Sequence, residues 1–467
     1  MAAKFGTSGL RGLATELVGE VARAHVRAFA RHLLRGKKVS PGNGLCIAFD
    51  YRDSSAQILD DVVHALAQEG LRAIVLGAVP TPALALEAIT RKTGAIMITG
   101  SHIPADRNGL KFYRPDGEID KRDEKAISAG VLKLKAATVG VARAVEQAVP
   151  SAFVARFTQA FKGKPLKGMR VAVYQHSTVA RDMLVELLQQ AGAKVTALGR
   201  SDHFIPVDTE AVSPETQQLI SSWCAAEAYD AVVSADGDGD RPLLADESGQ
   251  ILRGDFVGLI TALYLGAQTV VTPVTSNSGL DRHLPHGTLR SKVGSPFVIA
   301  RMNKAKAAGA KGIVGFEANG GFFTLSRFKV NGAVLAPLPT RDCFLPLLAV
   351  LAFAQQRKMK LSELSAHYAL PVAAAGRLED YPLAASGALM ARLQASPAAA
   401  GAFIAPLGFV VKTNSTDGLR FTLDTGAVVH LRPSGNAPEF RCYVEAADRP
   451  TAEALLLAAL RLIDQQR

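Results

Sequence analysis

Short apolar runs alternate with amphipathic stretches through most of the chain. Runs at 45–49, 73–76 and 95–98 predict three buried strands. Between the first two runs, apolar residues recur at helical spacing, at Ile58, Val62, Val63, Leu66 and Ala67. Gly70 ends that predicted helix, and Pro80 and Pro82 separate the second strand from the helix after it. The pattern therefore predicts an α/β unit in the N-terminal part of the chain.

The same order of elements restarts twice. Predicted strands at 169–174 and 231–233 and a helix at 177–190 form the second unit; strands at 269–274 and 312–316 and a helix at 297–307 form the third. Strands that alternate with helices predict α/β domains with mostly parallel sheets. The C-terminal part differs, because strands at 428–431 and 441–444 and a helix at 451–464 predict a smaller α+β domain.

The composition is that of a globular protein. Apolar residues make up 48% and charged residues 20% of the 467 positions, which excludes a disordered, collagenous or coiled-coil chain. The cysteines at 46, 224, 343 and 442 form no CxxC pair, so we expect a reducing compartment rather than a disulfide framework or zinc site. The N-terminus lacks the apolar run of a signal peptide, and no apolar stretch reaches the about 20 residues of a membrane span. We expect a cytoplasmic protein with no membrane partner.

Basic residues outnumber acidic ones. The 53 Lys and Arg against 42 Asp and Glu leave a net charge of +11. Nucleic acid, an anionic membrane surface and phosphorylated small molecules are all partners that such an excess fits. The basic residues are dispersed, aromatic residues are only 6%, and no nucleic-acid-binding motif appears. A nucleic-acid-binding protein is therefore the less favoured class.

The segment DGDGDR at 236–241 places a carboxylate at every second position. Asp236, Asp238 and Asp240 can wrap one loop around a cation, and hard oxygen ligands suit Mg²⁺ or Ca²⁺. An EF-hand is rejected, because Arg241 stands where that motif needs glycine and a strand precedes the loop. A solvated acidic turn is the alternative. The mutual repulsion of three carboxylates favours a cation between them.

The segment TGSHIP at 99–104 follows a predicted strand. Ligands of α/β domains gather at the carboxyl ends of strands, so Ser101 is placed to act as a nucleophile or phosphate carrier. His102 invites a Ser–His interpretation, but adjacent residues seldom point the same way and no GxSxG elbow is present. A helix cap or turn is the structural alternative for Ser101.

Two further segments carry polar residues suited to a phosphorylated sugar. In RPSGNAPEFR at 432–441, Arg432 can clamp a phosphate and the backbone around Gly435 can face an anion. In FEANGG at 316–321, Glu317 and Asn319 are suited to sugar hydroxyls. For both segments an ordinary turn is an equal alternative. The N-terminal loop GTSGLRG at 6–12 matches no nucleotide-binding fingerprint.

Together and in order, these loops resemble the α-D-phosphohexomutase superfamily. The resemblance is carried by FGTSGLRG at 5–12, TGSHIPADRNGLKFY at 99–113, DGDGDR at 236–241, GFEANGG at 315–321 and RPSGNAPEFR at 432–441. Five ordered motifs along the whole chain are far more specific than any one of them. The resemblance implies three related mixed α/β domains at 1–149, 150–254 and 255–369, and a smaller α+β domain at 370–467, around one central cleft.

The resemblance also implies a reaction. Members of this superfamily move a phosphoryl group between O1 and O6 of a hexose. Ser101 matches the family's phosphoserine, which gives up its phosphoryl group to form a hexose 1,6-bisphosphate, so that bisphosphate is the expected primer. The phosphorylated hexose is the only expected partner, and no obligate protein partner is predicted.

Residue roles follow from the same resemblance. Asp236, Asp238 and Asp240 would hold Mg²⁺ against the Ser101 phosphate, while Arg11 and Arg241 offset negative charge on the transferred group. Lys111 is the candidate general acid/base, provided that neighbouring cations favour its neutral amine, and His102 is a further catalytic candidate. The predicted substrate contacts are Lys292, Glu317, Asn319, Arg432, Ser434, Gly435, Asn436 and Arg441.

The sequence departs from the family pattern in three segments. Gly321 and Ser295 stand where many relatives have histidine, and Asn436-Ala437 stands where Thr-Glu is common. These departures put substrate preference in doubt. The TGSHIP and FEANGG loops look closest to bacterial phosphomannomutases, with glucose phosphates as further substrates. Phosphoglucomutase and phosphoglucosamine mutase are the rivals within the family, and a phosphatase-like hydrolase is a rival outside it.

Overall fold

A computed structural model describes residues 3–6, 9–134, 145–148, 151–434 and 438–467. Its internal contacts divide the chain into two units. Unit 1 comprises 1–270 and 294–367, and unit 2 comprises 271–293 and 368–467. Residues 271–293 thus group with the C-terminal part of the chain, although they lie within the predicted third domain.

The first sheet of unit 1 has the strand order β1-β2-β6-β5-β3-β4-β8, and β7 pairs with β6. The strands are β1 (Lys4–Phe5), β2 (Leu10–Leu13), β3 (Gly44–Phe49), β4 (Arg72–Gly77), β5 (Ala95–Ile98), β6 (Arg107–Arg114), β7 (Gly117–Glu118) and β8 (Val145–Gln147). Strands β5, β3, β4 and β8 pair in parallel. Strands β6, β2 and β1 pair antiparallel, so the sheet is mixed rather than mostly parallel as the alternating pattern predicts.

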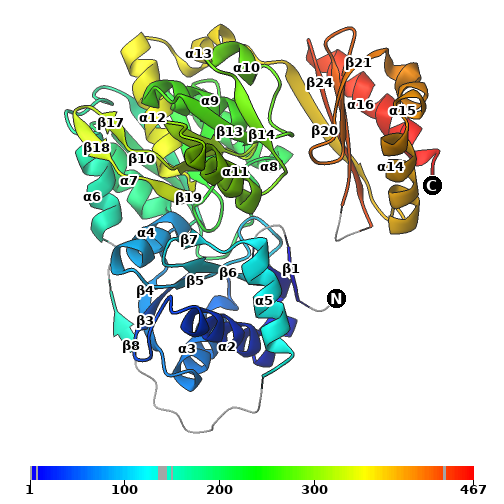
Figure 1. The fold of residues 1–467 in the computed structure, drawn as a ribbon. Coiled ribbons are helices and arrows are strands. Elements are labelled where there is room, and N and C mark those ends of the chain that lie inside the picture. The colour runs from blue at the N-terminus through cyan, green and yellow to red at the C-terminus, as the bar shows by residue number, and fades with distance from the viewer. Residues whose placement is uncertain (1–2, 7–8, 135–144, 149–150, 435–437) are drawn as a thin grey trace. The chain divides into compact units, whose positions relative to one another are not determined.

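Helices cover both faces of this sheet. Leu45 and Ile47 of β3 share a core with α2 (Glu20–Arg35) and α3 (Ser55–Gln68). The alternate residues Cys46 and Ala48 share another core with α4 (Thr81–Arg91). Figure 1 shows α2 and α3 on one face and α4 on the other. Because successive side chains of a strand point to opposite faces, a strand covered on both sides is a continuous apolar run. The short helix α1 (Ala14–Leu17) and α5 (Lys121–Val131) complete the domain.

The second sheet has the order β10-β9-β11-β12. Its strands are β9 (Arg170–His176), β10 (Lys194–Arg200), β11 (Ala231–Ala235) and β12 (Pro242–Ala245), with helices α6 (Ser151–Ala160), α7 (Arg181–Gln190) and α8 (Pro214–Ala226). Helix α7 begins later than the predicted 177. The Thr178 hydroxyl donates to the Asp236 carbonyl at 2.6 Å, and the Val179 N–H donates to the Gly237 carbonyl at 3.0 Å. These residues hold the acidic loop, residues 236–241, instead of forming a first helical turn.

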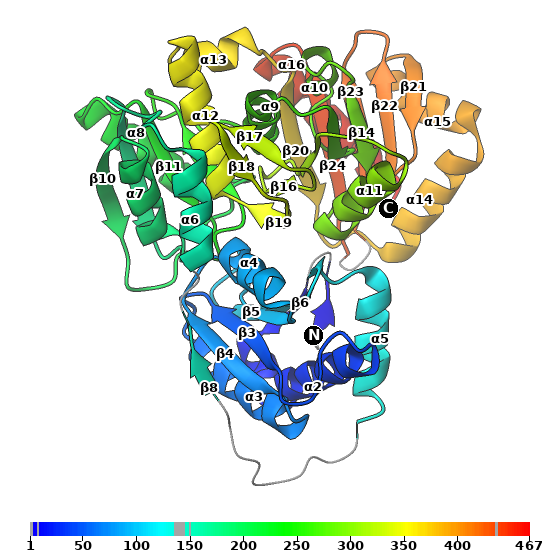
Figure 2. The ribbon, with the colours of Figure 1, turned by 60° about the vertical axis from the view of Figure 1, so that its left-hand side comes forward.

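The rest of unit 1 contains β15 (Ile313–Phe316), β16 (Phe322–Thr324) and β19 (Leu338–Asp342), which pair antiparallel in that order. Its helices are α9 (Gly254–Leu265), α11 (Ser295–Ala307), α12 (Phe344–Arg357) and α13 (Leu361–His367). A hairpin of β17 (Phe328–Val330) and β18 (Ala333–Leu335) packs beside α6 (Figure 2). Among the described residues, no helix combines the length and apolar character needed to cross a membrane.

Unit 2 is built on an antiparallel sheet of order β20-β24-β23-β22-β21. The strands are β20 (Val372–Leu378), β21 (Val410–Asn414), β22 (Leu419–Leu423), β23 (Val428–Pro433) and β24 (Phe440–Ala446). Figure 1 shows α14 (Leu383–Ala395), α15 (Pro397–Ile404) and α16 (Arg449–Asp464) on one face; a 3-10 turn, η1 (Ala405–Leu407), follows α15. Strand β13 (Thr269–Pro273) leads into this unit, which also holds α10 (Leu280–His283) and β14 (Thr288–Ser291). The predicted α+β character of the C-terminal domain is confirmed.

Candidate functional site

The loop DGDGDR connects β11 to β12 and is held by that hairpin. Asp236, Asp238 and Asp240 are all fully buried, and one oxygen of each lies within 4.8 Å of the others. The Asp236 Oδ1 accepts the backbone N–H groups of Asp240 at 3.1 Å and Arg241 at 3.0 Å. Gly239 has a φ of 68°, a conformation that glycine adopts at little cost and that lets the loop turn back on itself. A solvated acidic turn is therefore not what forms here.

The acidic loop has the properties of a cation site. The Oδ1 atoms of Asp238 and Asp240 are buried and accept no hydrogen bond from the described residues. Burial, together with the charges of Asp238 and Asp240, raises the pKa of Asp236 to about 8. A buried oxygen without a partner is costly, and a hard divalent cation relieves both the missing contact and the repulsion. The donor set therefore fits Mg²⁺.

Ser101 lies directly against this loop. Its hydroxyl donates to Asp236 Oδ2 at 2.5 Å, and its backbone N–H donates to the Thr99 hydroxyl at 2.7 Å. Ser101 has a φ of 57°, in the left-handed region that residues other than glycine rarely occupy. The His102 Nδ1 is 3.2 Å from the Ser101 Oγ, although the two residues are adjacent in sequence. Burial and the cations of Arg241 and Arg11 lower the pKa of His102, so its imidazole is neutral at neutral pH.

Arg52 holds the loop that carries Ser101, and sequence reasoning missed it. Its guanidinium donates to four carbonyl oxygens of this loop, those of Ser101 (2.9 Å), Ile103 (2.7 Å), Pro104 (2.6 Å) and Arg107 (2.8 Å). The Asp50 carboxylate accepts its Nε at 3.2 Å, and its Cζ lies 4.0 Å from the centre of the Phe204 ring. Both Asp50 and Arg52 follow β3 directly. The sequence signal that could have identified Arg52 is the charged pair Asp50 and Arg52 at the carboxyl end of a buried strand.

Lys111 contacts the acidic loop from β6. Its ammonium donates to Asp238 Oδ2 and to Asp240 Oδ2, each at 2.5 Å. The Thr81 hydroxyl also donates to Asp238 Oδ2 at 2.5 Å. The partners of Lys111 are two carboxylates, whereas its predicted role required neighbouring cations. In this arrangement Lys111 is suited to neutralise charge or to give up a proton.

Two arginines add positive charge around Ser101 and the acidic loop. The Arg241 Nε lies 3.7 Å from Asp240 Oδ1 and is buried without a hydrogen-bond partner among the described residues. Burial and the cations of Arg241 and Arg341 lower the pKa of Arg11 to about 10, which leaves it charged at neutral pH. A buried donor without a partner, next to a fixed cation, is suited to an anionic oxygen.

The loop between β15 and β16 carries Glu317 and Asn319. The Glu317 N–H donates to the Gly321 carbonyl at 3.1 Å, and the Asn319 Oδ1 accepts the Gly321 N–H at 3.0 Å. Asn319 thus makes the local turn that was the alternative interpretation of this residue. The Glu317 carboxylate accepts Arg341 Nη1 at 3.2 Å. Arg341 was not singled out in the sequence, because it lies on β19, far along the chain from the loops it contacts.

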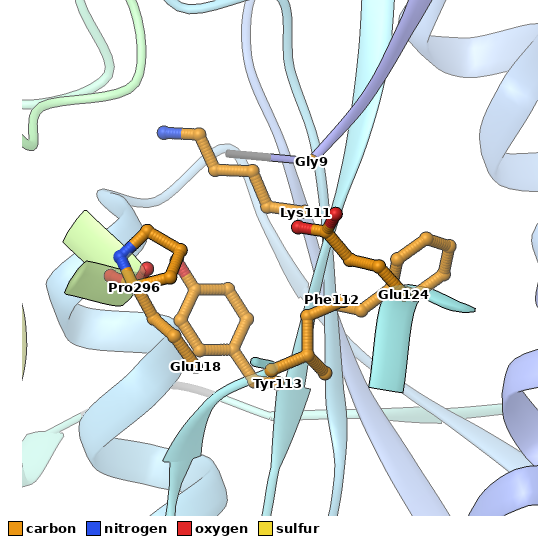
Figure 3. A pocket seen from close by; sticks show the side chains of 8 residues that line it. Gly9, Lys111, Phe112, Tyr113, Glu118, Glu124 and Pro296 are labelled. Carbon is orange, nitrogen blue, oxygen red and sulfur yellow. The ribbon is translucent and has the colours of Figure 1, made fainter. Parts of the chain in front are cut away.

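Ser295, one of the departures from the family pattern, has a defined partner. Its hydroxyl donates to Glu118 Oε2 at 2.7 Å, and the Thr340 hydroxyl donates to Glu118 Oε1 at 2.8 Å. Glu118, Pro296 and Tyr113 line a cavity of about 10 Å³ together with Lys111. Figure 3 shows Glu118 and Pro296 beside the ring of Tyr113. Ser295 therefore joins α11 to β7 within unit 1.

The remaining predicted contacts lie in unit 2. Arg432 Nε donates to Asp417 Oδ2 at 3.1 Å, and the same oxygen accepts the Val293 N–H at 2.9 Å. Asp417 thereby ties Arg432 to the segment that carries Lys292. Arg441 pairs with Glu439 at 3.1 Å. Ser434 follows β23, and the predicted residues Gly435 and Asn436 lie outside the described residues.

Comparison with known families assigns the chain. The models described as phosphoglucomutase/phosphomannomutase alpha/beta/alpha domains I, II and III match residues 2–138, 151–249 and 253–370, and the model of the C-terminal domain matches 383–461. These matches span most of the chain and come in the family's order. The chain belongs to the phosphoglucomutase/phosphomannomutase family.

Individual relatives agree with this assignment. The chain is 48% identical over 472 residues to a phosphomannomutase of Sinorhizobium fredii, covering 99% of both chains. It is 40% identical to a phosphomannomutase of Salmonella muenchen, covering 96% of this chain and 93% of the relative. A phosphoglucosamine mutase of Clostridium acetobutylicum is 30% identical over 65% of this chain and 71% of its own. A phosphoglucomutase/phosphomannomutase family structure from Burkholderia thailandensis shares the fold, with a TM-score of 0.77 at 20% identity, covering 98% and 97%.

Proposed function

We propose that this chain is a phosphomannomutase that interconverts mannose 6-phosphate and mannose 1-phosphate. The observation that carries the proposal is the Ser101 hydroxyl, 2.5 Å from an Asp236 carboxylate in a buried acidic loop and flanked by Lys111 and Arg241. The two phosphomannomutases align over nearly the whole chain, whereas the phosphoglucosamine mutase is less similar and aligns over less of it. Glucose phosphates are the second substrate class.

The reaction consists of two phosphoryl transfers. In the first, the bond from phosphorus to the Ser101 Oγ breaks as a bond to O6 of mannose 1-phosphate forms, and the hydroxyl proton of O6 ends on Ser101 Oγ. The mannose 1,6-bisphosphate turns over, and its O1 phosphoryl group returns to Ser101, whose proton ends on O1. Mannose 6-phosphate leaves, and the phosphoserine is restored without a net change of protons.

The residues around Ser101 have separate tasks in these transfers. Arg11 and Arg241 balance the negative charge that spreads over the transferred group. Lys111 and the neutral His102 imidazole, 3.2 Å from Ser101 Oγ, carry the proton between the hexose hydroxyl and the serine. Glu317 orients sugar hydroxyls, and Arg432, Ser434 and Lys292 hold the phosphate that does not react, together with Gly435, Asn436 and Arg441.

Mg²⁺ belongs in the acidic loop. Asp236, Asp238 and Asp240 would hold it, with a phosphate oxygen on Ser101 as a further ligand, and the bound ion supplies positive charge to that phosphate. Hexose 1,6-bisphosphate is the primer that loads Ser101. The four cysteines are free thiols, which supports a cytoplasmic location.

A substrate panel tests the proposed specificity. The full-length protein, primed with glucose 1,6-bisphosphate and Mg²⁺, is supplied in turn with mannose 1-phosphate, glucose 1-phosphate and glucosamine 1-phosphate. We expect the highest kcat/KM with mannose 1-phosphate and the lowest with the amino sugar. A clear preference for glucosamine 1-phosphate contradicts the assignment, and release of inorganic phosphate as fast as isomer formation favours a hydrolase instead.

A further inference from the structure

Arg341 joins two loops that the sequence predictions treated separately. It lies on β19 and is 3% exposed. Its Nε and Nη2 donate to Asp240 Oδ2 at 3.0 and 2.9 Å, and its Nη1 donates to Glu317 Oε2 at 3.2 Å. One buried guanidinium therefore spans from the acidic loop to the loop at 316–321.

The stem of Arg341 fills the space beside Gly321. A Cβ atom built on Gly321 would lie 2.6 Å from the Arg341 Cδ and 2.8 Å from its Cγ. Real side chains do not approach this closely, and a buried stem between two ion pairs cannot move aside freely. Position 321 holds no side chain while Arg341 keeps this conformation. Glycine at position 321, which departs from the family pattern, thus leaves room for the stem of Arg341.

The chemistry of the guanidinium limits what Arg341 can do. Its planar fork reaches two carboxylates in fixed directions, and it stays protonated at any working pH. Burial opposes the charge, but Asp240 and Glu317 more than offset it and raise the pKa of Arg341 further. Such a group sets distances and balances charge, and it cannot exchange protons with a substrate.

We propose that Arg341 is a positioning residue that sets Glu317 relative to Asp240, and that its stem takes the space in which other chains would carry a side chain at position 321. The proposal rests on the proposed mutase function, because it assigns Glu317 to the sugar and Asp240 to the acidic loop. As a consequence, the Glu317 carboxylate binds the sugar from a position that Arg341 on β19 fixes.

Three variants of the full-length protein test this role. Arg341→Lys keeps the charge but offers one donor group in place of the fork, Arg341→Ala removes both, and Gly321→Ala displaces the stem while all charges remain. We expect Arg341→Lys and Gly321→Ala each to raise the KM for the hexose phosphate about tenfold, with a smaller fall in kcat. Arg327→Lys, an exposed arginine after β16, is the matched control and leaves KM unchanged.

A double variant separates positioning from general damage to the fold. If the Cβ at 321 acts by displacing the stem, then Gly321→Ala has no further effect on KM once Arg341 is alanine. Equal effects of Gly321→Ala with and without Arg341 would overturn the proposal, and so would an unchanged KM in Arg341→Lys. If circular dichroism shows that Arg341→Ala does not fold, the KM values of Arg341→Lys and Gly321→Ala decide whether Arg341 has this role.

The outcome also distinguishes this inference from the proposed function. A wild-type protein that isomerises no hexose phosphate refutes the mutase assignment itself. An active wild-type protein whose Arg341→Lys and Gly321→Ala variants behave normally refutes only the role of Arg341.

Discussion

At the residue scale, charge balance around the acidic loop is the dominant feature. Asp240 is buried, which alone opposes ionisation, but the cations of Arg341 and Lys111 outweigh this cost and lower its pKa. At Asp236 the cations of Arg241 and Lys111 do not offset burial and the charges of Asp238 and Asp240, which raise its pKa to about 8. Two chemically identical side chains four positions apart thus hold protons differently, because Arg341 on the distant strand β19 pairs with only one of them.

The raised pKa of Asp236 predicts how Mg²⁺ stabilises the protein. The folded state holds a proton on this carboxyl that the unfolded state has lost, so in metal-free protein its contribution to stability falls as pH rises from about 4 to about 8. Protons and Mg²⁺ compete for the same oxygens. We therefore expect Mg²⁺ to raise the melting temperature more at about pH 9 than at about pH 6.

Scanning calorimetry with Mg²⁺ and with EDTA at each pH measures this difference. Comparing the two at one pH cancels the titration of groups elsewhere in the protein. In Asp236→Asn, whose side chain does not titrate, the pH dependence of the Mg²⁺ effect should disappear. A Mg²⁺ effect that is independent of pH in the wild type would show that no proton competes with the metal in this loop.

At the element scale, the site depends on how loops are held at strand ends. The loop after β5 carries Ser101, and four carbonyl oxygens along it accept hydrogen bonds from Arg52, which follows β3. These two strands are parallel neighbours, so their carboxyl ends lie together. The guanidinium of Arg52 lies over the Phe204 ring, and this cation–π contact helps to hold Arg52 in place.

Arg52→Ala should therefore damage catalysis beyond its effect on folding. The substitution removes the donors that hold four carbonyls, and a shift of about 1 Å at Ser101 is enough to cost on the order of 100-fold in kcat. Steady-state kinetics beside a thermal melt measures both effects. The control Arg35→Ala changes an exposed arginine at the end of α2 and should alter neither quantity. Near-normal kcat in a folded Arg52→Ala protein would mean that the loop holds its own conformation.

In unit 2 the same principle applies to the predicted phosphate contacts. Asp417, in the turn between β21 and β22, accepts Arg432 and the Val293 N–H with one oxygen. A charged acceptor shared by two segments holds both more firmly than separate turns would. Arg432, which was predicted from the sequence, is thus oriented by Asp417, which was not.

At the scale of the whole molecule, features set by local sequence pattern could be predicted, whereas contacts between distant parts of the chain could not. The strands β3, β5 and β11 could be predicted because each is a short apolar run, and the loops after β5 and β11 could be predicted because TGSHIP and DGDGDR follow those runs directly. The placement of Lys111 could not, since it depends on the antiparallel pairing of β6 with β5. Arg341 lies 101 positions from Asp240, and a single sequence carries no signal for such a contact.

The net charge of +11 is only partly explained by the site. Arg11, Lys111, Arg241 and Arg341 are buried or half-buried around Ser101 and the acidic loop of unit 1, and Arg432 and Lys292 belong to unit 2. Fixed cations of this kind attract an anionic substrate and hold its charge. They favour a phosphorylated small molecule over the nucleic-acid partner that the charge alone left open.

In the proposed mechanism Ser101 carries the phosphoryl group. Full-length protein incubated with mannose 1,6-bisphosphate and Mg²⁺ is digested, and the peptide that contains Ser101 is weighed by mass spectrometry, beside Ser101→Ala as control. We predict one added phosphoryl group on the wild-type peptide, still present after the protein has turned over mannose 6-phosphate, and no turnover in Ser101→Ala. An unmodified Ser101 peptide, or a Ser101→Ala protein with near-normal turnover, would contradict the mechanism.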